Sequence, residues 1–316
     1  MSSHSNAHHH SYPESGGRQT RLRLALSLML TLLFVVVETV AGSWAHSLAL
    51  LTDAAHNLTD VAALALSWYA HTLASRPSHA GKTFGYHRVG ILAALANSIT
   101  LAVLAAGICY EAWQRLQTPE PVDAGIVIGV GSIALVVNLL TAWLVSHGAK
   151  DDINLHSAFL HLMGDVLSTL GAIVAGIGIH YSGLYWLDPL ASALIAGLIL
   201  WNAWLIVRET LDILLESTPR DVEMSGVVRD LMQVDGVRGL HDLHVWSLSR
   251  NLRALSVHVL VDDMPISASA LIRAQLAERL AHRHGINHVT LQFESIGCQP
   301  DPLYCDITRR HKHASH

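Results

Sequence analysis

The stretch Leu51–Leu66, LTDAAHNLTDVAALAL, places charged and polar side chains inside an otherwise apolar run. These side chains follow the spacing i, i+3, i+4 and i+7, and they are Asp53, His56, Asn57 and Asp60. In an α-helix this spacing brings all four onto one stripe of the helix surface. An aspartate at the centre of a bilayer costs roughly 2.5–3.5 kcal/mol on insertion scales, so such a stripe needs a partner or a water-filled cavity.

A second apolar run repeats the pattern His-x3-Asp with His161 and Asp165. Two helices that each offer a histidine and an aspartate one turn apart can surround a divalent cation, and zinc accepts imidazole and carboxylate ligands in tetrahedral sites. A lone histidine is more often a packing residue, and Asp60 alone could pair with Arg88. The duplication argues against packing in both runs. The sequence therefore predicts one metal site made of His56, Asp60, His161 and Asp165.

Asp53 and Asn57 share the stripe, and two interpretations stay open for them: support and hydration of the metal ligands, or helix packing. Further polar positions in the apolar runs could join helices or line a path for ions. They are Glu38, Asn97, Asn138 and Ser168.

The composition indicates a membrane protein. The chain has 316 residues, of which only 14% are charged, and its mean hydropathy is +0.36. Soluble domains contain about 25% charged residues, so the chain is expected to cross a bilayer several times. The formal net charge of −5 is modest and the basic residues are scattered, which excludes a nucleic-acid-binding face. Three cysteines, Cys109, Cys298 and Cys305, form no disulfide framework.

Six apolar runs are each long enough for the roughly 20 residues that a membrane-spanning helix needs. The runs lie near 22–43, 48–73, 88–113, 123–146, 154–181 and 185–207. We therefore expect a six-helix transmembrane domain at 21–208, after a disordered His-rich tail at 1–20 whose histidines could collect zinc. Lysine and arginine flank the spans mainly on the side of both termini, which predicts cytoplasmic termini with Arg115 as the exception.

Residues 209–298 have the composition of a soluble domain, and a tail follows at 299–316. Strand-like alternation and helical periodicity predict the order αββαβ, a small sheet with helices on one face. The expected elements are a helix at Val222–Val234, strands at Leu240–Leu248 and Ala254–Val261, a helix at Ser267–His284 and a strand at His288–Glu294. The sequence thus predicts an α-helical polytopic membrane protein with a C-terminal cytoplasmic α+β domain.

The charge of the predicted metal site suggests a mechanism. Two carboxylates neutralise Zn²⁺, whereas a metal-free site would hold two buried negative charges, which favours protonation. Metal release and proton binding are therefore linked. A site of this kind that opens alternately to each side would act as a zinc/proton antiporter.

Several stretches of the chain resemble the cation diffusion facilitator family. They are SLALLTDAAHNLTD (Ser47–Asp60), TFGYHRVGILAALANS (Thr83–Ser98), KDDINLHSAFLHLMGDVLSTLG (Lys150–Gly171), DPLASALIAGLIL (Asp188–Leu200) and GLHDLHVWSLS (Gly239–Ser249). The resemblance implies six helices, a metallochaperone-like cytoplasmic domain, a homodimer and proton-coupled zinc efflux. It also implies a transport site at the four residues predicted above. Histidine rather than aspartate at the position of His56 is associated in this family with preference for zinc over cadmium.

The resemblance implies two further metal sites. Some relatives bind a metal in the loop between the second and third spans, where this chain offers only His87 and, as a substitute, His79. In the soluble domain His241, His258 and Glu294 match ligand positions, while Gln292 replaces an expected histidine. This pattern implies one regulatory zinc ion, and the alternative is a set of ordinary polar residues on an exposed sheet face. Cys298 and Cys305 could join tail histidines in a site of their own.

Two other classes of function remain as alternatives. A membrane metalloenzyme would need an open coordination position and a general base, and the chain has no HExxH motif. A zinc sensor would use the soluble domain but would not need acidic motifs inside apolar helices. We expect a secondary transporter without a resident cofactor, whose partners are zinc, protons, lipid and a second copy of the chain. The short connection between the fourth and fifth runs, which lacks a long His-rich insertion, favours a bacterial inner membrane.

Overall fold

The computed structural model describes the backbone of residues 14–146, 153–249, 252–295 and 303–304. Within these ranges, only the backbone is described at 14–28, 30, 71, 144–146 and 153–161. The described residues fall into two compact units, which we treat separately. One unit runs to Ala65 and includes Asn97–Trp204, and the other contains Leu66–Ala96 and the residues from Leu205 onward.

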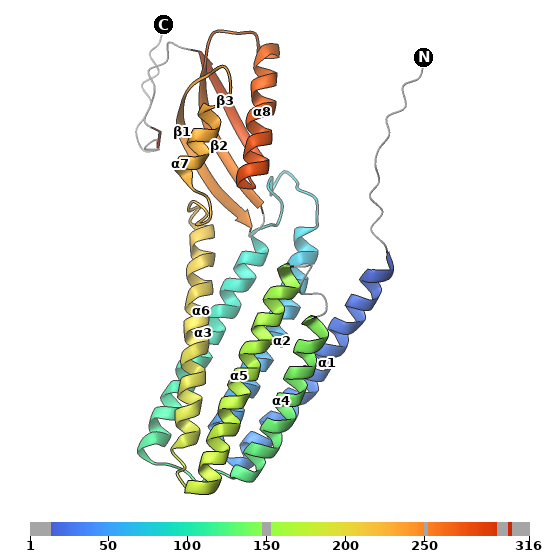
Figure 1. Ribbon diagram of the computed structural model, residues 1–316, viewed down its shortest axis with the longest axis vertical. Helices are drawn as coiled ribbons and strands as arrows, with labels where there is room; N and C mark the ends of the chain where they lie inside the picture. The colour runs from blue at the N-terminus through green and yellow to red at the C-terminus, as the bar shows by residue number, and fades with distance from the viewer. Residues whose placement is uncertain (1–13, 147–152, 250–251, 296–302, 305–316) are drawn as a thin grey trace. The chain divides into compact units, whose positions relative to one another are not determined.

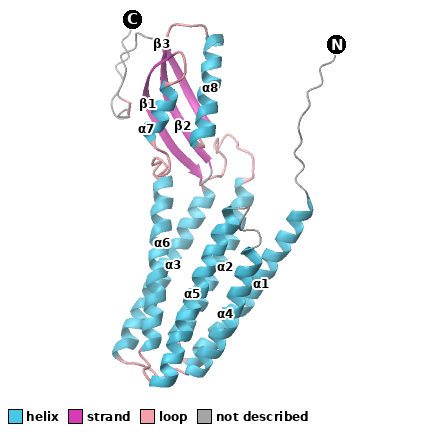
Figure 2. Cartoon of the chain, viewed as in Figure 1, coloured by secondary structure: helices cyan, strands magenta, loops and turns pink. Residues whose placement is uncertain are grey.

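Six long helices occupy the six predicted apolar runs (Figures 1 and 2). They are α1 (Glu14–Ala45), α2 (Leu48–Ala74), α3 (Val89–Gln117), α4 (Ala124–Ser146), α5 (Ile153–Ser182) and α6 (Leu187–Leu214). The two largest differences from the predicted bounds lie at the start of α1 and at the end of α6. Helix α1 begins at Glu14, inside the stretch assigned to the tail, and α6 continues past residue 208 to Leu214. Helix α6 can continue beyond its apolar segment because the extension contains good helix formers.

Four of these helices are long and apolar enough to cross a membrane, counted over the described residues. The qualifying segments are Val89–Gln117, Ala124–Trp143, Leu162–Ser182 and Leu187–Leu214. In α1 the described side chains form an unbroken run only over Thr31–Ala45, so this helix is not counted. Helix α2 is not counted because its polar stripe lowers its mean hydropathy. The polar stripe is therefore the feature that separates α2 from an ordinary membrane span.

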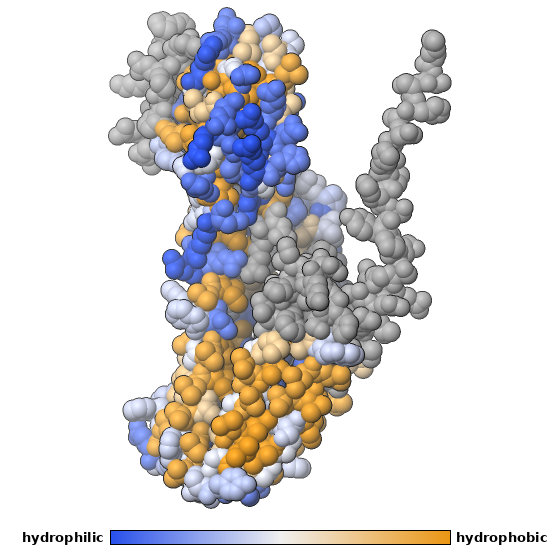
Figure 3. All heavy atoms as spheres, in the orientation of Figure 1, coloured by the Kyte–Doolittle hydropathy of each residue, from blue (hydrophilic) through white to orange (hydrophobic). Residues whose placement is uncertain are grey.

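The helices expose large apolar side chains on their outer faces. Figure 3 shows a mostly hydrophobic surface over the helical domain, and Val103, Val174 and Leu198 are all more than half exposed. A water-soluble helical domain would bury such side chains, whereas lipid tails solvate them without cost. The chain is therefore a multi-pass membrane protein.

Helix α2 is fixed at its N-terminus by a carboxylate from another helix. Asp188, at the start of α6, accepts hydrogen bonds from the Ser47 hydroxyl (2.6 Å) and from the backbone N–H groups of Leu48 (2.7 Å) and Ala49 (3.4 Å). The first N–H groups of a helix have no partner within it, so a buried helix start needs an acceptor from elsewhere. Asp188 thereby sets the position of the helix that carries the polar stripe.

Arg115, the exception to the expected charge distribution, is neutralised locally. Its guanidinium lies 3.0 Å from Glu111 and 3.7 Å from Glu120, and it donates to the carbonyl oxygen of His46. These contacts satisfy the guanidinium of Arg115 at its helix end, but they do not account for its departure from the pattern of the other basic residues.

The cytoplasmic domain has the predicted order αββαβ. Its elements are α7 (Met224–Met232), β1 (Val237–Ser249), β2 (Leu252–Val261), α8 (Ile266–His284) and β3 (His288–Ser295). The strands form one sheet in the order β1-β2-β3, with β1 and β2 antiparallel and β2 and β3 parallel. Leu231 of α7 and Leu276 of α8 are fully buried in one core with alternate residues of β2, such as Val257 and Val259. The two helices therefore cover one face of the sheet.

The opposite face of the sheet carries polar side chains. His258 lies on β2 between the core residues Val257 and Val259, so it points away from the helices. It is the cross-strand partner of His241 on β1 and of Gln292 on β3. The register thus brings ligand-type residues of three strands into one row.

Candidate functional site

A cluster of three metal-ligand side chains lies between α2 and α5. The Nε2 atom of His56 lies 3.6 Å from Oδ2 of Asp60 and 3.4 Å from Oδ1 of Asp165. One ligand atom from each residue falls within 4.8 Å of the other two. His56 and Asp60 meet because they are one turn apart on α2, and Asp165 is brought to them by the packing of α5.

These separations suit a small divalent cation better than a hydrogen bond. Zinc bonds of about 2.0–2.1 Å directed to the corners of a tetrahedron place the ligand atoms about 3.3 Å apart. An N–H to oxygen hydrogen bond is shorter, at about 2.7–3.2 Å between heavy atoms. The side chains of His56 and Asp165 are 16% and 6% exposed, so the cluster is mostly shielded from solvent.

His161 is the fourth predicted ligand, and its side chain lies outside the described residues. Its backbone belongs to α5, one turn before Asp165. Residues four apart share one face of a helix, so the backbone is compatible with a ligand from His161 on the side of Asp165.

Asp53 and Asn57 form hydrogen bonds between helices beside this cluster. Asp53 is 1% exposed and accepts from the hydroxyl groups of Ser168 and Thr169, both at 3.1 Å. The side-chain amide of Asn57 donates to Glu38 on α1 (3.3 Å). These contacts fit both open interpretations, because they join helices and also hold the ligand-bearing turn of α2 in place.

Thr169 is a polar residue that the sequence did not single out. Its hydroxyl accepts from the side-chain amide of Asn138 on α4 (3.1 Å), and it lies within hydrogen-bond distance of Asp53 and of the backbone carbonyl of Asp165. A single hydroxyl in an apolar run gives no signal by itself, because threonine usually donates to its own helix. Only the packing of three helices reveals its position beside Asp165.

Arg88, the alternative partner of Asp60, has an acidic neighbour of its own. Its guanidinium donates to the carboxylate of Glu216 at 2.7 Å. The contact accounts for the charge of Arg88 without Asp60.

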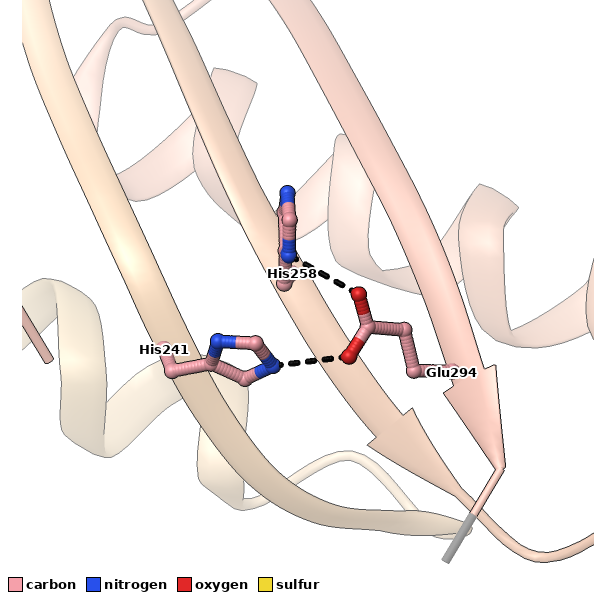
Figure 4. Close-up of side chains that lie close together, drawn as sticks. All are labelled: His241, His258 and Glu294. Carbon is pink, nitrogen blue, oxygen red and sulfur yellow. Dashed lines mark hydrogen bonds and ion pairs between the residues drawn. The ribbon is translucent and has the colours of Figure 1, made fainter. Parts of the chain in front are cut away.

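A second cluster lies on the polar face of the sheet (Figure 4). One carboxylate oxygen of Glu294 lies 2.9 Å from Nε2 of His241, and the other lies 2.9 Å from Nδ1 of His258. The two imidazole rings are 4.9 Å apart between centroids, and His241 is only 3% exposed. The three ligand atoms fall within 4.8 Å of one another, as in the helical cluster.

Two further residues extend this cluster, and neither was among the candidate ligands. Oδ1 of Asp242 lies 3.0 Å from Nε2 of His244, and Oδ2 lies 3.5 Å from Nε2 of His258. Asp242 has a positive φ of 51° at a bulge in β1, a conformation that aspartate tolerates better than most residues. The bulge turns both histidines of the HDLH motif toward one face, which strict alternation would not predict for residues three apart.

The surroundings of Glu294 lower its pKa and favour its ionised form. Partial burial acts to raise its pKa, but hydrogen bonds from Gln292 and His241 and the charges of His241 and His258 outweigh this effect and lower the pKa. A carboxylate that is ionised at neutral pH can bind a cation without first losing a proton. Gln292, which replaces an expected histidine, therefore supports the carboxylate through its side-chain amide (2.9 Å).

The predicted loop site is not assembled in the part of the chain that the structure describes. His79 lies 3.1 Å from the hydroxyl of Tyr86 and accepts from the backbone N–H of Gly81. His87 and His79 are in neither of the two groups of three ligand atoms among the described residues. Cys298 and Cys305 and the terminal histidines lie outside the described residues.

Comparison with known proteins extends over nearly the whole chain. Residues 24–215 match the family model described as the cation efflux transmembrane domain, and residues 219–296 match that of the cation efflux protein cytoplasmic domain. The first match includes all four residues of the predicted transport site, and the second includes the sheet cluster.

Three curated proteins illustrate the similarity. A cadmium, cobalt and zinc/H(+)-K(+) antiporter of Bacillus subtilis is 37% identical over 302 residues, which cover 92% of this chain and 96% of that protein. The metal cation efflux system protein CzcD of Cupriavidus metallidurans is 36% identical, with 92% and 91% covered. The zinc transporter ZitB of Escherichia coli is 34% identical, with 99% of both chains covered. The solved metal-bound C-terminal domain of CzcD is 34% identical over 23% of this chain and 99% of that chain, with a TM-score of 0.21.

Proposed function

Because the chain belongs to the cation diffusion facilitator family, whose members are secondary transporters of metal cations rather than enzymes, we propose that it exports zinc from the cytoplasm in exchange for protons. Transport proceeds by alternating access to one ion site formed by His56, Asp60, His161 and Asp165. The observation that carries this proposal is the convergence of ligand atoms of His56, Asp60 and Asp165 from α2 and α5 at the spacing of a tetrahedral zinc site.

The charge balance of the site supports coupling to protons. Asp60 and Asp165 together neutralise a divalent cation, so the loaded site tolerates the low dielectric of the helical domain. The same two carboxylates repel each other when the cation leaves, and protons relieve that repulsion. Inward flow of protons down their gradient therefore drives outward movement of zinc. The name of the Bacillus relative includes protons and potassium as exchanged ions, which agrees with a cation-coupled mechanism.

We place the protein in the inner membrane of a bacterial cell, with both termini in the cytoplasm. The distribution of lysine and arginine supports this orientation, with Arg115 as the exception. The matched cytoplasmic-domain family supports a homodimer assembled through that domain.

The sheet cluster supports a regulatory role for the cytoplasmic domain. His241, His258 and Glu294 form a compact triad on a rigid sheet, and we propose that it binds one zinc ion when cytoplasmic zinc is high. Sensing is then part of the transporter and not a separate function. A metalloenzyme is disfavoured because four protein ligands would leave no open coordination position for a substrate or a reactive water.

Growth in excess zinc tests the proposal directly. A host that lacks its own zinc exporters should be rescued by the wild-type chain and not by Asp60→Ala or Asp165→Ala. Glu120→Ala, which removes an exposed carboxylate at 55% side-chain exposure, is the matched control and should rescue fully. Immunoblots of membranes establish equal amounts of each variant. Full rescue by both aspartate variants would refute the assigned site, and zinc flux into proteoliposomes without opposing proton movement would refute the exchange.

A further inference from the structure

A second pair of acidic side chains lies in the helical domain, apart from the metal-ligand cluster. Glu38 of α1 is completely buried and Asp53 of α2 is 1% exposed. The two carboxyl groups lie within hydrogen-bond reach of each other. No lysine or arginine of the described residues forms an ion pair with either group. Two buried acids in contact without a basic partner are costly when both are ionised.

The hydrogen-bond partners of the pair show where a proton belongs. Asp53 is satisfied by the hydroxyl groups of Ser168 and Thr169, and one oxygen of Glu38 accepts from Asn57. The other oxygen, Oε1 of Glu38, is buried and has no hydrogen-bond donor among the described residues. Ionised carboxylates only accept hydrogen bonds, so a bond between two of them requires that one carries the proton. A protonated carboxyl in this pair would therefore satisfy both acids.

The pair is connected to the metal-ligand cluster through Thr169. The threonine hydroxyl has one proton and two acceptors, Oδ2 of Asp53 (3.1 Å) and the backbone carbonyl of Asp165 (2.9 Å). It can donate to Asp53 when that acid is ionised and to the carbonyl of Asp165 when Asp53 is protonated. The side-chain amide of Asn138 donates to the hydroxyl oxygen of Thr169 and fixes the position of this oxygen. A change of protonation at the pair thereby changes the hydrogen bonding of the helix turn that holds Asp165.

We propose that Glu38 and Asp53 form a proton-binding site, separate from the four metal ligands, that carries a counter-transported proton. This inference rests on the proposed zinc/proton exchange and names a place for one of its protons. The positive charge of a zinc ion at the neighbouring ligands favours loss of the proton, which leaves two carboxylates near the cation. Departure of zinc restores the repulsion between the acids, and the pair binds a proton again.

Among the described residues, the side chains that donate hydrogen bonds to the pair are neutral. Asn57 comes from α2, Ser168 and Thr169 come from α5, and Asp165 of α5 adds a negative charge that acts on the pair. The metal ligands His56 and Asp60 follow Asp53 along α2. No neighbour in this set can hold both acids ionised in the absence of metal. The counter-charge has to come from zinc or from a proton.

The test counts protons released when zinc binds to the full chain in detergent, in weakly buffered solution with a pH indicator. Glu38→Gln keeps the shape of the side chain and donates to Asp53 as a protonated glutamate would, but it has no proton to lose. We expect this variant and Asp53→Asn to bind zinc and to release about one proton fewer per zinc ion than the wild type. Glu38→Asp, which keeps an acid, should recover the missing proton. Thr141→Val, a buried threonine that donates to its own helix, is the matched control and should behave as the wild type.

The outcomes separate this inference from the function on which it rests. If both amide variants release as many protons per zinc ion as the wild type, the proton-binding pair is overturned and zinc/proton exchange stays in place. Zinc binding to the wild type without any proton release would overturn both. The same variants are also compared for zinc uptake into proteoliposomes with potassium or choline as the external cation. A potassium-dependent uptake that is lost in Glu38→Gln while the proton count is unchanged would assign the pair to potassium and overturn the proposal.

Discussion

The two clusters of histidine and carboxylate use similar side chains but are built in different ways. In the helical cluster Nε2 of His56 lies 3.6 Å from Asp60 and 3.4 Å from Asp165, beyond the range of a good hydrogen bond. In the sheet cluster Glu294 lies 2.9 Å from His241, to which it is hydrogen-bonded, and 2.9 Å from His258, with which it forms an ion pair. The helical cluster is therefore spaced more widely, as for an ion, whereas the side chains of the sheet cluster already contact one another through a hydrogen bond and an ion pair.

This difference matches two different tasks. A transport site must bind and release its ion in each cycle, so ligands held apart by helix packing are an advantage. A regulatory site needs a threshold, and the hydrogen bond between His241 and Glu294 provides one because zinc has to displace it. The helical cluster depends on the contact of α2 with α5, while the sheet cluster depends on strand register within one small domain. Substitutions should therefore affect the two clusters independently.

The largest expected effect is on the rate of zinc transport, which should fall much more after a substitution in the helical cluster than after one in the sheet cluster. Asp165→Asn removes one ligand charge and should lower zinc flux by at least about 100-fold, since even the residues that support metal ligands contribute 10–100-fold. Glu294→Gln should change flux by no more than about fivefold, the low end of coupling between distant sites. Zinc flux into proteoliposomes, normalised to protein content, measures both. Equal losses in the two variants would mean that the clusters do not have separate roles.

The next largest effect concerns the core beneath the sheet cluster. Leu276 of α8 is fully buried against the sheet, so Leu276→Ala should lower the free energy of unfolding of the cytoplasmic domain by about 2–5 kcal/mol. Leu271→Ala on the same helix, where the side chain is 73% exposed, should change it by less than about 0.5 kcal/mol. Hydrogen exchange of the β2 amides in the full chain reports these values. A large loss for Leu271→Ala would indicate that its face of α8 is covered in the assembled protein.

A smaller effect is expected where α6 holds the start of α2. Asp188→Ala leaves three buried donors without their acceptor and should destabilise the first turn of α2 by about 1–3 kcal/mol. Asp188→Asn keeps one acceptor oxygen and should lose less. The exchange rates of the Leu48 and Ala49 amides measure the change. Unaltered rates in Asp188→Ala would show that another group caps the helix.

The smallest expected effect is the pH dependence of the cytoplasmic domain. Desolvation opposes ionisation of Asp230, but hydrogen bonds from His284 and Arg283 and the charges of both residues outweigh it and lower the pKa of Asp230. A lowered pKa in the folded state gives stability that is present above the ordinary pKa of aspartate and is lost as the pH falls through the lowered value. Denaturation midpoints from neutral to acidic pH should fall less steeply in Asp230→Asn than in the wild type. The exposed Asp263→Asn is the control, and identical slopes for Asp230→Asn and the wild type would contradict the pairing.

Most of the fold could be predicted from the sequence because its signals are local. Hydropathy and length identify six helices, and alternation in Leu255–Val261 identifies the central strand of the sheet. The bounds of α1 and α6 were less accurate, since a helix does not end where its apolar face ends. Val257 and Val259 were correctly expected on one face because side chains alternate along a strand.

The candidate sites were predictable where one helix or a repeated motif supplied the ligands. His56 and Asp60 follow from helical spacing alone, and their meeting with Asp165 follows from the duplication of the motif. Asp242, His244 and Thr169 escaped prediction because a β-bulge and contacts among three helices determine where they lie. Such features arise from tertiary packing, and a single sequence carries no local signal for them.

Zinc-edge anomalous diffraction from crystals of the full chain grown with zinc tests the central claim most directly. We expect one anomalous peak about 2.0–2.2 Å from the ligand atoms of His56, Asp60 and Asp165, and a second peak at the sheet cluster. In crystals of Asp165→Asn the first peak should weaken or vanish while the second remains. A wild-type map with zinc at the sheet cluster and elsewhere in the helical domain, but none among these three side chains, would contradict the account.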